Sequence, residues 1–181
     1  MEVYGCVHFA DIYRRTEKGV GVGLGNFDGL HLGHAALIEA LKNKCAERAI
    51  PSVVYTFANH PNNVLFPETP TSLIVTNTQK TALMKGMGVD GVFFEHFDKK
   101  YAAATPEQFV KEILVDKLNA KVVVTGQNYS FAHKGSGTPE LLKKLGEKYG
   151  FADIFNFEAT TVIFFVIGIV IGFKVSSKIQ A

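Results

Sequence analysis

The chain has 181 residues, of which 47% are hydrophobic, which is enough for one domain with a sizeable core. Its formal net charge is +2 and its basic residues are scattered singly or in short pairs, so nothing indicates nucleic acid as a partner. Two cysteines, Cys6 and Cys45, are too few for a disulfide framework, and the first residues contain no sustained apolar run, so we expect a cytoplasmic protein without a secretory signal.

The first predicted unit is a strand, a tight loop and a helix. Residues 20–24 alternate apolar and small side chains as a strand does, and Leu37, Ile38 and Leu41 have helical spacing. Between them, residues 25–34 read Gly-Asn-Phe-Asp-Gly-Leu-His-Leu-Gly-His. A helix start leaves backbone N–H groups unpaired and carries a partial positive charge, so this loop predicts a phosphate site.

Two histidines, His31 and His34, stand three positions apart at this helix start and therefore share one face of a turn. Each imidazole can donate a hydrogen bond to a phosphate oxygen, and Gly29 and Gly33 let the backbone approach a ligand closely. A single histidine is commonly an ordinary core or surface residue. Two of them in a strand–loop–helix setting favour the phosphate site.

The rest of the chain alternates short apolar runs with helical patterns. Strands are predicted at 52–57, 91–95 and 121–125, and helices begin at the capping patterns 76–79, 105–108 and 138–139. This alternation predicts an α/β fold, a Rossmann-like parallel sheet with helices on both faces and the ligand at the carboxyl ends of the strands.

Two further motifs follow predicted strands and so converge on the same edge of the sheet. Residues 56–61 read Thr-Phe-Ala-Asn-His-Pro, and residues 126–137 contain Asn128 with the alternating aromatic residues Tyr129 and Phe131. An amide that donates and accepts, between aromatic walls, suits a planar ring. The alternatives are that His60-Pro61 only ends a strand and that the aromatic residues are ordinary core.

Together the three motifs resemble the FMN adenylyltransferase module of prokaryotic FAD synthetases, which belongs to the nucleotidylyltransferase superfamily with its His-x-Gly-His element. The resemblance runs from about residue 20 to about residue 151. It implies a nucleotidyltransferase that moves AMP from ATP to FMN, giving FAD and pyrophosphate, with His31 and His34 as the catalytic residues.

The resemblance also implies the contacts of the two substrates, and Asp28 is further expected to orient a histidine. ATP is expected at Gly25, Asn26, Phe27, Asp28, Gly33, Ser176, Ser177 and Lys178, and FMN at Asn59, His60, Pro61, Asn128, Tyr129 and Phe131. Asn59 stands where many members have proline and Ala132 where glycine is frequent. Mg²⁺ is inferred from the polyphosphate substrate alone, because the sequence shows no dedicated cage of carboxylates.

The end of the chain departs from the family pattern. Residues 174–181 look like the family's Ser-Ser-Thr-x-x-Arg element without its threonine and arginine, although Lys178 keeps a positive charge nearby. We expect residues 1–158 to form the FMN adenylyltransferase domain and residues 159–181 an atypical apolar segment. Its uncharged part, 159–173, is short for a membrane-crossing helix and favours buried strands, with a membrane anchor or a frameshifted gene end as alternatives.

We expect this chain to lack the riboflavin kinase domain that often follows in the family, and therefore to adenylylate FMN without making it. Two other functions stay open. One is adenylyl transfer to another small phosphorylated substrate, against which the motifs around His60 and Asn128 argue. The other is a degenerate, non-catalytic flavin or nucleotide binder, which the altered chain end favours.

Overall fold

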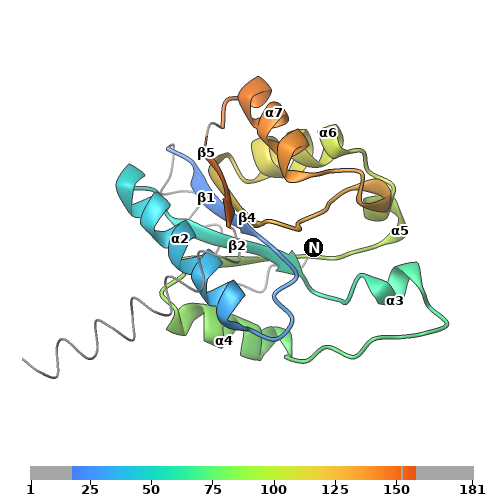
Figure 1. Ribbon diagram of the computed structural model, residues 1–181. Coiled ribbons are helices and arrows are strands. Elements are labelled where there is room, and N and C mark those ends of the chain that lie inside the picture. Colours follow the sequence, from blue (N-terminus) through green and yellow to red (C-terminus); the bar gives the residue numbers. More distant parts are fainter. Residues whose placement is uncertain (1–17, 152, 158–181) are drawn as a thin grey trace, which may run out of the picture.

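The computed structural model describes residues 18–151 and 153–157, and its centre is a parallel sheet (Figure 1). The strands are β1 (Val20–Leu24), β2 (Ser52–Phe57), β3 (Gly91–Glu95), β4 (Ala120–Gly126) and β5 (Asp153–Phe157). Their order is β3-β2-β1-β4-β5, and every neighbouring pair is parallel. The predicted Rossmann-like α/β fold is confirmed, with β5 as a strand that the sequence analysis did not predict.

Helices cover both faces of the sheet, as predicted (Figure 1). On one face α2 (Leu32–Arg48) and α4 (Asn77–Gly86) bury Leu41 and Met84, and on the other the π-helix η1 (Phe109–Lys117) and α7 (Pro139–Tyr149) bury Leu114 and Leu142. Short helical turns fill the connections: α3 (Asn62–Leu65), α5 (Lys99–Ala102), α6 (Pro106–Gln108) and η2 (His133–Gly135).

The small residues of β1 allow α2 to lie close against the sheet. A Cβ atom at Gly21 would collide with Cys45 Sγ, and one at Gly23 would come within 3.1 Å of Leu41 Cδ2. The alternation of valine and glycine in β1 therefore places the start of α2, with its two histidines, directly beyond the carboxyl end of that strand.

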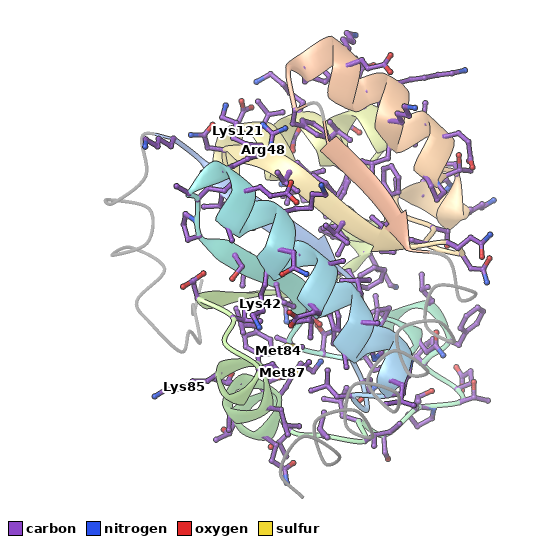
Figure 2. All side chains as sticks on the ribbon, turned by 60° about the vertical axis from the view of Figure 1, so that its left-hand side comes forward. Lys42, Arg48, Met84, Lys85, Met87 and Lys121 are labelled. Carbon is purple, nitrogen blue, oxygen red and sulfur yellow. The ribbon has the colours of Figure 1, made fainter. Side chains whose placement is uncertain are left out.

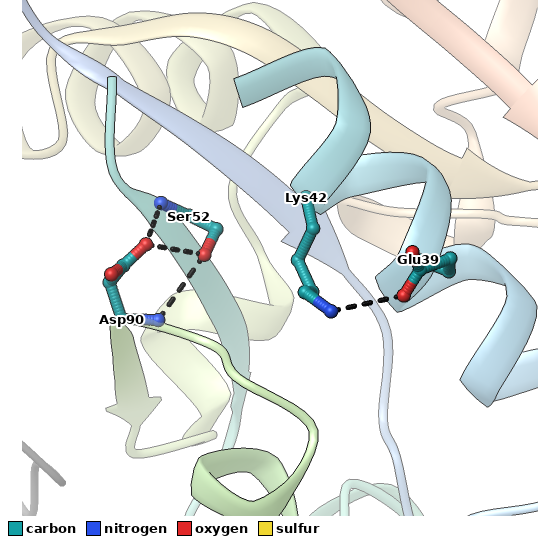
Figure 3. Close-up of polar contacts among 4 residues, drawn as sticks. All are labelled: Glu39, Lys42, Ser52 and Asp90. Carbon is teal, nitrogen blue, oxygen red and sulfur yellow. Dashed lines mark hydrogen bonds and ion pairs between the residues drawn. The ribbon is translucent and has the colours of Figure 1, made fainter. Parts of the chain in front are cut away.

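Side-chain hydrogen bonds hold the helix starts and the opposite edge of the sheet. The predicted capping boxes at Thr76 and Thr105 are both formed. At the beginning of β2, the Ser52 hydroxyl donates to Asp90 Oδ2 at 2.7 Å and accepts from the Asp90 N–H at 3.2 Å (Figure 3). These contacts lie at the amino ends of β2 and β3, so they stabilise the sheet away from the edge where the motifs converge.

The apolar segment 159–173 and the expected ATP contacts Ser176, Ser177 and Lys178 lie outside the described residues. Within residues 18–151 and 153–157, none of the helices combines the length and the hydropathy that crossing a bilayer requires.

Candidate functional site

A cavity of about 460 Å³ lies at the carboxyl ends of β1 and β4. These two strands are neighbours at the centre of the sheet, where the chain connections diverge, and a doubly wound sheet binds its ligand at that point. The cavity is lined by Leu24, Gly25, Asn26, His31, Gly33, His34, Leu37, Gly126, Gln127, Asn128 and Tyr129. The structure thus brings the histidine loop and the Asn128 segment together across about a hundred residues of sequence.

A second cavity of about 380 Å³ adjoins the first and shares Asn26, Asn128 and Tyr129 with it. Its other walls are Phe57, His60, Pro61, Asn62, Leu65, Phe97, Tyr101, Ser130, Phe131, Ala132 and Gly135. The aromatic side chains Phe57, Phe97 and Tyr101 contact one another, with ring centroids 5.2 to 5.5 Å apart. Sequence reasoning did not identify these three residues as site residues. Phe57 lies within the motif 56–61 and the other two lie outside the motifs, but an aromatic residue alone does not show whether it lines a cavity or packs in the core.

The two histidines make different hydrogen bonds through Nδ1. His31 is the N-cap of α2, and its Nδ1 accepts from the His34 backbone N–H at 3.3 Å. His34 Nδ1 lies 3.1 Å from the Gly29 carbonyl oxygen, which can only accept, so this nitrogen carries the hydrogen. The rings stack with centroids 3.7 Å apart. In their neutral forms, His31 therefore offers an Nε2–H donor, whereas His34 Nε2 is an acceptor.

The surroundings of His34 keep it neutral. Burial lowers the pKa of the His34 imidazole, the charge of His31 and that of Lys80 lower it further, and the hydrogen bond to Gly29 opposes them. A neutral His34 presents a lone pair at Nε2. It can donate to a phosphate oxygen through that nitrogen only after taking up a proton.

Phe27 and Asp28 shape the loop from behind the cavity. The Phe27 side chain is fully buried, with its ring 4.9 Å from the His34 ring, and its φ angle is +48°. Asp28 Oδ1 accepts from the backbone N–H groups of Ile74 and Val75 at 2.9 and 3.3 Å. The expectation that Asp28 orients a histidine is wrong in this structure, because the Gly29 carbonyl does so.

Lys80 lies next to the site, and sequence reasoning did not select it as a site residue. Its side chain is fully buried beneath the loop, where Nζ donates to the Asn26 carbonyl oxygen at 3.0 Å and to Thr56 Oγ1 at 3.4 Å. Burial lowers the pKa of Lys80, and the nearby Asp28 carboxylate opposes that shift.

Asn59 lies behind the second cavity and supports its loop. Its Nδ2 donates to the Phe97 carbonyl oxygen and its Oδ1 accepts from the Phe97 N–H, both at 2.9 Å. These reciprocal bonds fasten the loop that follows β2 to the backbone after β3. The walls of the cavity include His60 and Pro61 but not Asn59, so the side chain expected to contact FMN is placed in a supporting position.

Ala132 occupies a backbone conformation that suits glycine. Its φ and ψ are 64° and −169°, a region that costs a residue with a side chain about 1 to 3 kcal/mol. We therefore expect Ala132→Gly to raise the free energy of unfolding by about 1 kcal/mol, after the entropy cost of a glycine is subtracted. Chemical denaturation measures this change, and Ala103→Gly, at an αR C-cap, is the matched control that should lower stability. A loss of stability in Ala132→Gly would contradict the conformation.

Comparisons with known proteins point to one family. The family model described as FAD synthetase matches residues 13–160. The bifunctional riboflavin kinase/FMN adenylyltransferase of Escherichia coli K12 is 31% identical over 141 residues, which cover 78% of this chain and 45% of that protein. The enzyme of the same name from Pseudomonas fluorescens is 32% identical over 139 residues, covering 76% and 44%. The chain therefore spans less than half the length of these curated relatives.

A solved structure has the same fold. The crystal structure of a macrolide-efflux protein from Streptococcus pneumoniae matches this chain with a TM-score of 0.68 and 26% sequence identity. The match covers 79% of this chain and 46% of that one. It supports the arrangement of sheet and helices that carries the two cavities.

Proposed function

We propose a function from the premise that this chain belongs to the FAD synthetase family. It transfers the adenylyl group of ATP to the phosphate of FMN and releases FAD and pyrophosphate. The observation that carries the proposal is the pair of adjoining cavities that share Asn26, Asn128 and Tyr129. One contains a helix start and two imidazoles suited to a polyphosphate, and the other has aromatic walls suited to a flavin ring.

The reaction joins the substrates where the two cavities meet. A phosphate oxygen of FMN attacks the α-phosphorus of ATP, and the bond between that phosphorus and the bridging oxygen to the β-phosphate breaks as pyrophosphate leaves. The FMN phosphate is already an anion near neutral pH, so no general base is required. The protein's task is to hold two anions in line and to stabilise the charge that develops on the leaving group.

The N-terminus of α2 and the two histidines supply that stabilisation. The first N–H groups of a helix lack intrahelical partners and point toward a bound anion. His31 offers Nε2–H in its neutral form, because its Nδ1 is already used as the N-cap acceptor. His34 becomes a second donor once the phosphates raise its pKa and it takes up a proton.

Magnesium enters this proposal as part of the substrate, bound to the phosphates of ATP. The described residues contain no group of three or more histidine, cysteine, aspartate or glutamate side chains arranged to hold a metal ion. Asp28, the carboxylate of the loop before α2, already accepts from two backbone N–H groups. We assign no protein ligand to the ion and no step to it.

Binding of pyrophosphate near neutral pH is expected to be coupled to proton uptake by His34. The free imidazole has a lowered pKa and is neutral, and a bound anion raises that pKa, so affinity should increase as the pH falls. Calorimetric titrations in two buffers with different ionisation enthalpies measure the uptake. His34→Gln, which does not titrate, is the control. Equal proton uptake by the wild type and His34→Gln would contradict the assignment.

A panel of acceptors tests the function against its alternatives. Purified protein is incubated with ATP and Mg²⁺ together with FMN, riboflavin, phosphopantetheine or nicotinamide mononucleotide, and the products are separated by chromatography. We expect an adenylylated product with FMN alone. A product with another phosphorylated acceptor would replace the substrate assignment, and binding without any product would indicate a non-catalytic nucleotide or flavin binder.

A further inference from the structure

Among the lysines in residues 18–151, Lys80 is unusual because its side chain is completely buried. Lys42, on the surface of α2, has Glu39 as an ion-pair partner at 3.0 Å (Figure 3). Lys85, five residues further along α4, is exposed and points away from the sheet (Figure 2). Within the described part of the chain, Lys80 forms no ion pair with a carboxylate, and its Nζ has two neutral oxygen atoms as acceptors.

A buried ammonium group without a carboxylate partner is costly, so a compensating role is expected. The carbonyl oxygen that Lys80 Nζ contacts indicates what that role is. The Asn26 carbonyl oxygen accepts from Lys80 Nζ at 3.0 Å and from Thr56 Oγ1 at 2.7 Å, and Asn26 lines both cavities. The charge therefore lies directly beneath the loop that leads into the start of α2.

Hydrogen bonds near Lys80 fasten α4 and the residues before it to the loops that follow β1 and β2. Asp28 binds the backbone just before α4, and Asn77 at the first position of α4 donates through Nδ2 to the Ala58 carbonyl oxygen at 2.9 Å. The aspartate carboxylate is engaged with backbone N–H groups and is not bonded to Lys80. A positive charge in a low-dielectric setting acts over several ångströms. The charge of Lys80 accordingly contributes to the lowered pKa of His34.

We propose that Lys80 is a positioning residue that fixes the Asn26 carbonyl and supplies a positive field beneath the polyphosphate of the nucleotide. This inference rests on the proposed function for the identity of the anion. The buried charge of Lys80 attracts the phosphates without contacting them, and the exposed His31 and the half-buried His34 provide the direct hydrogen bonds. Its loss should weaken the binding of polyphosphate much more than that of the flavin.

Lys80→Met tests this role because it keeps an unbranched side chain and removes the charge. We expect the dissociation constant of inorganic pyrophosphate, measured by calorimetry, to rise about tenfold, while that of riboflavin changes less than about twofold. The His34 pKa, followed by NMR of the imidazole C–H signals, should rise because a neighbouring positive charge is gone. Lys80→Arg, which keeps the charge, should retain most of the pyrophosphate affinity.

Two control variants separate the charge from its surroundings. Thr56→Val removes the other donor to the Asn26 carbonyl oxygen, together with the weaker of the two acceptors of Lys80 Nζ, and it keeps the formal charge. Lys85→Met removes an exposed charge from α4, the helix that also carries Lys80. Both should leave the pyrophosphate affinity and the His34 pKa near their wild-type values. If Lys80→Met does not fold, Lys80→Gln gives the same comparison.

Unchanged pyrophosphate affinity in the folded, uncharged variant would overturn the inference, and so would an equal loss in Thr56→Val. These measurements do not depend on turnover. If the wild type binds pyrophosphate in a Lys80-dependent way but forms no FAD, the proposed function fails and the role of Lys80 stands. If the wild type forms FAD and Lys80→Met binds pyrophosphate as well as the wild type does, the proposed function stands and the role of Lys80 fails.

Discussion

His31→Ala is expected to form FAD about a hundredfold more slowly than the wild type, on the scale of losing one donor to the developing charge. The variant removes the Nε2–H that the neutral imidazole presents, because Nδ1 is held as an acceptor by the His34 backbone N–H. It also removes the N-cap of α2, which costs about 1 kcal/mol of stability. Steady-state rates with saturating FMN and ATP measure the effect.

His31→Asn separates the two roles of His31. Asparagine is a good N-cap, so the stability should return toward that of the wild type, but its shorter side chain places no donor where Nε2 stood. The rate should therefore stay about as low as in His31→Ala. His34→Ala should show a loss of similar size, since it removes the second donor. Wild-type rates in both alanine variants would show that the histidine pair does not carry the chemistry.

Phe27→Ala is expected to lower the free energy of unfolding by about 3 to 5 kcal/mol, the usual range for truncating a fully buried phenylalanine. The ring packs with the core residues beneath α2 and lies against the ring of His34. The positive φ angle of Phe27 persists only because this packing holds it, so the loop should lose its shape together with the ring.

Chemical denaturation measures the cost of Phe27→Ala. Phe66→Ala is the matched control, because Phe66 is 59% exposed and its loss should change stability by no more than about 0.5 kcal/mol. A change in Phe27→Ala as small as that of the control would mean that the Phe27 side chain does not support the loop.

The parallel sheet and the position of the site could be predicted because their signals are local. Glycine and valine alternate in β1, threonine residues cap helices at Thr76 and Thr105, and three motifs each follow a strand. Parallel strands end at one edge, so the motifs had to converge there. By contrast, β5 could not be predicted. It is a short strand that is followed in the sequence by the apolar segment 159–173, and no change in residue composition marks where the strand ends.

The parts of the site that could not be predicted depend on contacts between distant segments. Asn59 and Asp28 are expected to contact substrates, and the structure adds that their side chains bind the backbone of Phe97, Ile74 and Val75. Lys80 lies 54 positions from the carbonyl it contacts. The different hydrogen-bonding states of the two histidines follow from the Gly29 carbonyl oxygen, whose position only the folded loop defines.

The most direct test of adenylyl transfer at this site follows the α-phosphate of ATP. Purified protein is incubated with FMN, Mg²⁺ and ATP labelled at the α-phosphorus, beside the His31→Ala variant. The proposed function predicts that label appears in FAD, together with an equal amount of pyrophosphate, and that the variant forms about a hundredfold less of both in the same time. Label that stays in ATP, or that is released as AMP without FAD, would contradict it.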